Sequence, residues 1–194
     1  MSALLSCSPC PFAAEPHWQP WELFRRAQIS REVEGWLRAD GSLTRRVIHF
    51  CDQRFRVRVL YQGWGRPSAR ERGHLGMGRV ATAWIREVEL LCGATPWVFA
   101  RTLIPVTTLR GAARRLMYLR DKPLAAVLFA DPGVRRQGME MAILTPQHRL
   151  FHAASLALTS RPSRLWGRRT LFKVDGRPLL VHEIFLPTLL NVEP

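Results

Sequence analysis

The chain has 194 residues, of which 47% are apolar and seven are tryptophan; this composition excludes a disordered chain and is enough for one domain with a substantial core. Its formal net charge is +14, and 29 basic residues minus Lys122 and Lys173 leaves 27 arginines. Because the arginines are spread along the chain, the charge by itself does not indicate a nucleic-acid-binding stripe. No apolar run approaches the roughly 20 residues that span a bilayer, so we expect a soluble, cytoplasmic protein.

The four cysteines give no sign of a metal centre. Cys7 and Cys10 form one C-x-x-C motif in a proline-rich segment, but no second pair follows at the spacing of a zinc site. Cys51 and Cys92 each stand alone in the sequence. We therefore expect no bound metal, and free thiols in a reducing compartment.

The N-terminal part of the chain predicts a leader followed by short helices. Residues 1–20 carry four prolines and little periodicity, which predicts a loose leader. Residues 21–37 have apolar positions at helical spacing and predict two short helices. After a break, Ser42 is a suitable N-cap for a helix over residues 43–48. We expect a single domain over residues 21–194.

The remainder of the chain is dominated by strands. Alternating patterns predict strands over residues 54–61, 84–92, 97–104, 133–144, 168–175 and 179–186. A Gly- and Arg-rich loop is expected over 63–78 and a helix over 108–116. Residues 124–129 fit either a helix or a strand, and residues 146–162 have no clear pattern. This order predicts an α+β fold with a single antiparallel β-sheet and helices covering one face.

Two charged residues occupy strand positions that the alternation otherwise gives to apolar side chains. Arg86 has this register within residues 84–92, and Glu183 has it within residues 179–186. A charge that faces a core is costly unless it is paired or holds a polar ligand. The two residues therefore indicate either a buried site for a small anion or a buried ion pair that fixes strand register. Arg101 is a third charge in apolar register.

Several segments, taken in order, resemble one known family. They are WIREVELLC over residues 84–92, PW over 96–97, ARTLIP over 100–105, LWGRR over 165–169 and GRPLLVHEIFLP over 176–187. This ordered set resembles the chorismate pyruvate-lyase family of bacterial ubiquinone biosynthesis, from about Trp36 to Pro187.

The resemblance implies helical flaps over a buried ligand pocket, and a cofactor-free lyase that converts chorismate into 4-hydroxybenzoate and pyruvate, the first committed step of ubiquinone biosynthesis. Matched by motif, Arg86 would hold the ring carboxylate, and Glu183 would meet the hydroxyl at the opposite end. Leu43 falls at a pocket position of the family, and Leu124 falls where a backbone group contacts the ligand. Arg101, one hairpin strand from Arg86, would serve the second carboxylate or reinforce the positive field.

The chemistry needs orientation of the substrate and control of one proton. Losing the ether side chain and a ring proton makes the ring aromatic, so the reaction is strongly downhill. A guanidinium matches both oxygens of a planar carboxylate, which makes Arg86 the expected anchor. Glu183 is the expected proton-transfer residue, either as acid toward the ether oxygen or as base at the ring carbon.

Two other functions compete with the enzyme. The effector-binding domains of some bacterial transcription regulators resemble this lyase fold and bind small ligands without converting them. Such regulators carry an N-terminal winged helix, for which the 35 residues before Trp36 are too few. A nucleic-acid binder would need a continuous basic face. We therefore expect an enzyme, monomeric, with chorismate and 4-hydroxybenzoate as ligands and no nucleic-acid partner.

Overall fold

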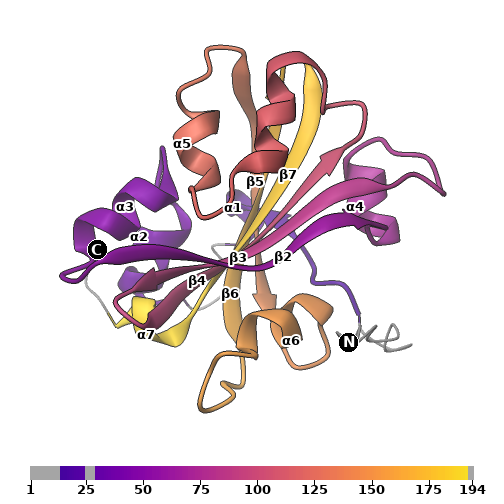
Figure 1. Ribbon diagram of the computed structural model, residues 1–194. Helices are drawn as coiled ribbons and strands as arrows, with labels where there is room; N and C mark the ends of the chain where they lie inside the picture. Colours follow the sequence, from indigo (N-terminus) through magenta and orange to yellow (C-terminus); the bar gives the residue numbers. More distant parts are fainter. Residues whose placement is uncertain (1–13, 25–28, 192–194) are drawn as a thin grey trace, which may run out of the picture.

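The computed structural model describes residues 14–24 and 29–191 (Figure 1). Within these residues one sheet has seven strands in the order β1-β5-β6-β7-β4-β3-β2, and every neighbouring pair is antiparallel. The strands are β1 (Gln19–Pro20), β2 (Phe55–Gly65), β3 (Ala83–Cys92), β4 (Thr95–Pro105), β5 (Val134–Leu144), β6 (Leu165–Val174) and β7 (Arg177–Phe185). The predicted α+β fold with one antiparallel sheet is confirmed.

Short helices connect and flank the strands. They are α1 (Trp21–Phe24), α2 (Arg31–Leu37), α3 (Leu43–Phe50), α4 (Ala69–His74), the 3₁₀ helix η1 (Gly111–Tyr118), α5 (Leu124–Leu128), α6 (Arg149–Ser155) and α7 (Pro187–Leu190). Ser42 caps α3 as predicted, because its Oγ accepts a hydrogen bond of 3.3 Å from the Arg45 amide. In the described part of the chain, no helix has the length and apolar character needed to cross a membrane.

Helices pack on both faces of the sheet, whereas the sequence indicated cover on one face. On one face, Val33, Trp36 and Leu37 of α2 join an apolar cluster with Leu90 of β3. On the other face, α6 places Phe151 in a separate cluster with strand residues of β4, β5 and β7. Figure 1 shows α2 and α3 to the left of the sheet and α4 to its right. The helical layer that contains α6 was not predicted, because residues 146–162 have no clear helical period.

The described part of the predicted leader is ordered on the sheet. Trp18 is only 8% exposed and belongs to the α6-side cluster. The next two residues form β1, which pairs with β5 at the edge of the sheet. The described residues from Trp18 to Pro20 are therefore packed on the sheet and are not loose; a two-residue strand is too short to give a period. Cys7 and Cys10 lie outside the described residues.

The predicted loop over residues 63–78 contains α4. Ser68 and Glu71 form a capping box, in which the Glu71 amide donates to Ser68 Oγ at 3.2 Å and the Ser68 amide donates to Glu71 Oε2 at 2.7 Å. The capping-box signature S-x-x-E is present in the sequence, but the surrounding glycines and arginines favoured a loop over a helix. The capping box matters because Glu71 is buried against the sheet.

A β-bulge in β4 places Trp97 on the face opposite to the one that strict alternation predicts. Leu90 pairs with Val98 and Leu91 pairs with Pro96, so Trp97 is the extra residue of the bulge. Strict alternation would place Trp97 on the face of Phe99, but Trp97 packs in the α2–α3 cluster, on the opposite face. Arg86 and Glu183 lie beyond the bulge, and their alternation is unaffected.

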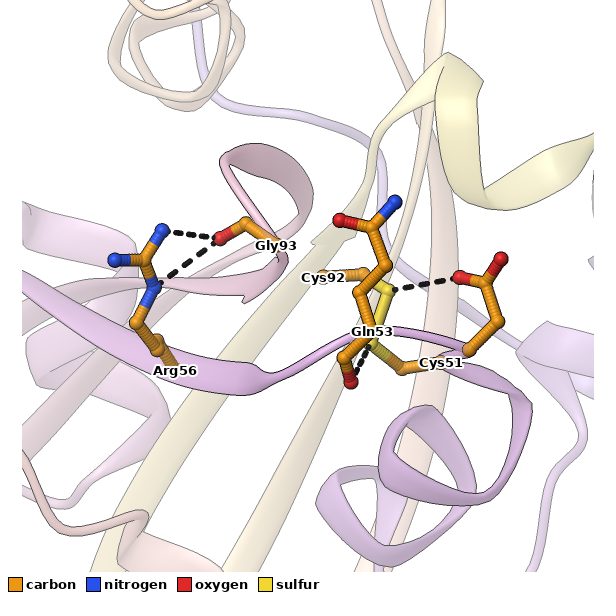
Figure 2. Close-up of a disulfide and its surroundings, with 6 residues drawn as sticks. Cys51, Gln53, Arg56, Cys92 and Gly93 are labelled. Carbon is orange, nitrogen blue, oxygen red and sulfur yellow. Dashed lines mark hydrogen bonds between the residues drawn. A yellow bond between two sulfur atoms is a disulfide. The ribbon is translucent and has the colours of Figure 1, made fainter.

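Cys51 and Cys92 form a disulfide, which corrects the expectation of two free thiols. Figure 2 shows the bond joining the end of α3 to the end of β3. Nearby, Arg56 of β2 donates from Nε and Nη2 to the Gly93 carbonyl, at 3.1 and 2.5 Å, which closes the β3–β4 turn against β2. The two cysteines are 41 residues apart in sequence, and their proximity depends on the packing of α3. One end of α3 is therefore covalently fixed to the sheet.

Candidate functional site

A pocket lies on the sheet face that carries Arg86 and Glu183, where α3 and α5 cover the sheet. Its empty volume, which includes open solvent at its mouth, is about 640 Å³. The lining residues come from the sheet and from the α3 and α5 regions: Gly41, Leu43, Thr44, Val57, Arg86, Val88, Leu90, Ala100, Thr102, Pro123, Leu124, Ala125, Leu128, Phe129, Arg136, Arg168, Thr170, Phe172, Val181 and Glu183. Four of the predicted site residues, Leu43, Arg86, Leu124 and Glu183, are thus brought together.

Arg86 is a buried cation whose described hydrogen-bond partners are neutral. It is 2% exposed, and its Nη1 donates to Gln62 Oε1 at 2.6 Å while its Nη2 donates to the Lys122 carbonyl at 3.1 Å. Burial lowers the pKa of Arg86 below its ordinary value, and the charge of Asp121 only partly opposes this effect. A guanidinium stays protonated under such conditions, so Arg86 presents a largely uncompensated positive charge to the pocket.

Gln62 fixes the direction of the Arg86 side chain. Gln62 lies directly opposite Arg86 in the β2–β3 register, and its Nε2 donates to the Met117 carbonyl at 3.0 Å. The amide is thereby oriented with its oxygen toward Arg86. Arg86 is held from two sides, by β2 and by the segment that precedes α5, and both supports are polar but uncharged.

Glu183 lines the same pocket and is paired with Arg168. The two residues are direct partners in the β6–β7 register, and Arg168 Nε lies 2.6 Å from Glu183 Oε2. Arg168 is 2% exposed, whereas the Glu183 side chain is 17% exposed toward the pocket. The arrangement fixes the orientation of the carboxylate, and among the described residues Oε1 has no hydrogen-bond donor, so it can accept further hydrogen bonds.

Arg168 also binds the connection between α2 and α3. Its Nη1 donates to the Leu37 carbonyl at 3.2 Å and to the Ala39 carbonyl at 2.9 Å. The Leu37 carbonyl belongs to the last turn of α2, where helical acceptors have no intrahelical donor, and the Ala39 carbonyl lies two residues further on. Sequence reasoning did not select Arg168, although the alternation of β6 gives it the face of Trp166 and Phe172, the same signal that selected Arg86.

Leu43 and Leu124 enter the pocket from the two covering helices. Leu43 is the first residue of α3 and Leu124 the first residue of α5, so each lies at a helix N-terminus, where the backbone amides lack an acceptor one turn earlier. Leu43 is 3% exposed. Both residues therefore line the pocket from the first position of a covering helix.

Arg101 does not join the other predicted site residues. It lies on the opposite face of the sheet, where its Nε donates to Glu71 Oε1 at 3.0 Å and its Nη1 pairs with Glu87. The neighbouring β4 residues Ala100 and Thr102 are the ones that line the pocket. The expected role of Arg101 toward the second substrate carboxylate is therefore wrong: its charge is used in a buried network with two carboxylates.

The charges that line the pocket suit an anionic ligand. Arg86, Arg136 and Arg168 contribute three positive charges and Glu183 one negative charge, which leaves a formal sum of +2. The floor between them is apolar or hydroxyl-bearing, with Val88, Leu90, Ala100, Thr102, Thr170 and Val181. Such a pocket can hold a flat, partly apolar molecule with two negative charges and present a carboxylate to it.

Known proteins resemble this chain along most of its length. Residues 16–193 match the model of the chorismate lyase family. A probable chorismate pyruvate-lyase of Aromatoleum aromaticum is 41% identical over 181 residues, which cover 91% of this chain and 97% of the relative. A probable chorismate pyruvate-lyase of Methylococcus capsulatus is 41% identical over 160 residues, 82% of this chain and 98% of the relative.

Solved structures with little sequence similarity share the fold. PhnF from Mycobacterium smegmatis has a TM-score of 0.57 at 12% identity, over 78% of this chain and 66% of that chain. The effector domain of the same protein has a TM-score of 0.55 at 15% identity, over 76% of this chain and 90% of that chain. At these identities the likeness concerns the fold alone, whereas the family match rests on the sequence. The chain belongs to the chorismate lyase family.

Proposed function

We propose that this protein is a chorismate pyruvate-lyase, which converts chorismate into 4-hydroxybenzoate and pyruvate. The proposal rests on the presence of two groups in one pocket. Arg86 supplies a buried guanidinium whose charge is largely uncompensated, and Glu183 supplies a carboxylate whose orientation is fixed. Relatives that are 41% identical over most of their length and are named probable chorismate pyruvate-lyases support the same reaction. In this role the protein supplies 4-hydroxybenzoate for ubiquinone biosynthesis.

Arg86 binds the ring carboxylate of chorismate. Arg86 lies on β3, two strands away from Glu183 on β7. The registers of these strands offset Arg86 from Glu183 by two residues along the strand direction. Strand spacing and rise put their Cα atoms about 12 Å apart along the sheet. A six-membered ring with its carboxylate and the hydroxyl opposite fits between two side chains that start at this separation.

Leu43 and Leu124 complete the substrate contacts. Both residues line the pocket at a helix N-terminus, and a backbone amide in that position suits a carboxylate or hydroxyl oxygen. Their side chains shield the ring from water. The side chains of the strands below then act as an apolar floor.

Glu183 manages the proton. The reaction removes the hydrogen on the ring carbon that carries the hydroxyl, and the ether bond to the neighbouring carbon breaks as the ring becomes aromatic. The leaving enolpyruvate takes up a proton and becomes pyruvate, so the atoms of chorismate are divided completely between the two products. Because Arg168 pairs with Glu183 as a carboxylate, the geometry favours Glu183 as the base at the ring carbon. The same residue can then return the proton, and the conversion needs no cofactor.

The proposed function also includes an oligomeric state, a cellular location and a role for the net charge. We infer a monomer with one domain over residues 21–194, against whose sheet residues 14–20 lie. The substrate and product are small polar anions, which supports a cytoplasmic enzyme without nucleic-acid partners. The +14 charge then acts as a general attraction for anionic substrate.

The test is to mix the purified protein with chorismate, without added metal or nucleotide, and to separate the products by chromatography. The proposal expects 4-hydroxybenzoate and pyruvate in equal amounts. Binding of chorismate without conversion would instead identify a sensor, as in the regulator domains that share the fold. No binding and no conversion would leave Arg86 and Glu183 with structural roles.

A further inference from the structure

Arg136 is a third arginine that lines the pocket, beside Arg86 and Arg168, and its charge is poorly compensated. Arg168 is neutralised by Glu183, and Arg86 faces the end of the pocket assigned to the ring carboxylate. The ion pair of Arg136 is with Asp40, at 3.9 Å between Nη1 and Oδ1, and the Asp40 side chain is 99% exposed. A contact of that length to a fully hydrated carboxylate neutralises little charge.

The position of Arg136 is fixed by neutral contacts. Its Nη2 donates to the Gly41 carbonyl at 2.8 Å, and its guanidinium lies over the ring of Phe172 at 5.8 Å from the centroid. Phe172 is also its direct partner in the β5–β6 register. The side chain is 27% exposed, in contrast to the buried Arg86. Arg136 is therefore held at the more open end of the pocket.

Arg86 and Arg136 lie on opposite sides of Glu183 in the sheet. Glu183 is on β7, Arg86 is two strands away on β3, and Arg136 is two strands away in the other direction on β5. All three side chains line the same pocket. A ligand with two separated carboxylates can therefore reach one guanidinium with each carboxylate.

We propose that Arg136 binds the second carboxylate of chorismate, the one on the enolpyruvyl side chain. This inference rests on the proposed function, and it gives Arg136 the role that Arg101 cannot fill from the opposite face. The reaction separates the two carboxylates, because one stays on 4-hydroxybenzoate and the other leaves with pyruvate. Arg136 therefore contacts the substrate but has no carboxylate to bind in the 4-hydroxybenzoate complex. It contributes to recognition of the substrate over the aromatic product.

The test compares Arg136→Gln with the wild type in two measurements, the KM and kcat for chorismate and the Kd for 4-hydroxybenzoate by calorimetry. Loss of a charged hydrogen-bond partner raises the KM for chorismate by about 10- to 100-fold. The Kd for 4-hydroxybenzoate stays within about twofold of the wild type, which also shows that the pocket is intact. Arg136→Lys keeps the charge and recovers part of the affinity.

Arg135→Gln is the matched control, because Arg135 is the exposed neighbour on β5 and the change removes the same charge. This control leaves both constants unchanged. If Arg136→Gln leaves the KM for chorismate unchanged, or if it weakens 4-hydroxybenzoate as much as chorismate, the assignment of Arg136 is wrong. If the wild type itself does not convert chorismate, the proposed function fails and this inference fails with it. Measuring the wild type first keeps the two failures distinct.

Discussion

Arg168 and Glu183 are direct cross-strand partners on β6 and β7, and their side chains meet at 2.6 Å on the wall of the pocket. The same guanidinium binds the carbonyls of Leu37 and Ala39 in the connection to α3. One buried side chain therefore joins the Glu183 carboxylate to the segment that leads into the covering helix α3. The position of Glu183 depends on the packing of α2 and α3 as well as on its own strand.

Replacing Arg168 with methionine is expected to lower both activity and stability. The change keeps much of the apolar stem but leaves the Glu183 carboxylate without its cation. Breaking a buried pair costs about 3–5 kcal/mol, and we expect about 3 kcal/mol because Glu183 is partly exposed. Urea unfolding measures the stability, and steady-state turnover, which should fall at least about tenfold, measures the activity.

The double variant Arg168→Met with Glu183→Gln provides the control. If the two residues act as a pair, their separate effects on stability are not additive, and the coupling is about 1–3 kcal/mol. Additive losses would mean that Arg168 supports the fold through the carbonyls alone.

Replacing Arg86 with glutamine is expected to weaken binding of 4-hydroxybenzoate. Glutamine cannot supply two parallel donors or a charge, so the Kd should rise by about 10- to 100-fold. Calorimetry at constant ionic strength measures this change. Arg114→Gln, a change of equal charge at an exposed position of η1, should leave the Kd unaltered. An unchanged Kd in Arg86→Gln would contradict the anchor role.

The buried network on the other face predicts acid sensitivity. His182 is 1% exposed, and burial, despite the charge of Glu71, lowers its pKa from 6.5 to about 3, with Arg101, Arg169 and His74 acting in the same direction as burial. The unfolded chain therefore binds a proton between pH 6.5 and 3 that the folded protein does not. Stability should fall as the pH falls through this window, by up to about 1.4 kcal/mol per pH unit.

Glu71 acts at lower pH. Burial alone would raise its pKa, but the charges of Arg101 and His182 and its hydrogen bonds bring the pKa from 4.5 down to about 2. Its contribution is complete above pH 4.5 and is lost as the pH falls toward 2. The two groups together make the protein progressively less stable from pH 6.5 downward.

The variant His182→Phe isolates the histidine contribution. Phenylalanine can keep the stacking against Trp18, where the ring centroids are 5.3 Å apart, and it removes two buried ring nitrogens that lack hydrogen-bond partners in the described structure. Thermal unfolding from pH 7.5 to 5 should show a shallower loss of stability than in the wild type. Some slope remains, because burial also lowers the pKa of His74 and His148. A slope equal to that of the wild type would rule out His182 as its source.

Loss of the Cys51–Cys92 disulfide is expected to destabilise the protein and loosen α3. A bond that closes a loop across 41 residues restricts the unfolded chain by up to about 4 kcal/mol. The oxidised wild type should therefore lose roughly 2–4 kcal/mol when a thiol reductant is added. The double variant Cys51→Ala with Cys92→Ala should match the reduced protein and be insensitive to the reductant. Equal stability with and without reductant in the wild type would contradict this role.

Strand faces were predictable from the sequence because the sheet positions follow a period of two. Arg86 and Glu183 were identified by that period alone, and both line the pocket. Arg101 satisfied the same rule but lies on the other face, because alternation gives the register within one strand and not which face of the sheet holds the pocket. The position of Arg101 is explained by the helical layer on that other face, where Glu71 of α4 supplies the opposite charge.

Features that depend on distant contacts were not predictable. The disulfide requires α3 to pack beside the end of β3, and the sequence separation of its cysteines gives no hint of this. Arg168 carried the alternation signal but looked like one of many arginines until its pairing with Glu183 was seen. Trp97 lies on the face opposite to the one that strict alternation predicts, because one extra residue in β4 reverses the alternation.

The most direct test of the whole account is the turnover of chorismate by Glu183→Gln beside the wild type. Glutamine keeps the size of the side chain but cannot exchange a proton, so turnover should fall by about 10- to 1000-fold. Binding of 4-hydroxybenzoate should persist, since Arg86 is unchanged. Turnover close to that of the wild type, with the same affinity for 4-hydroxybenzoate, would show that Glu183 does not carry the proton and would contradict the central claim.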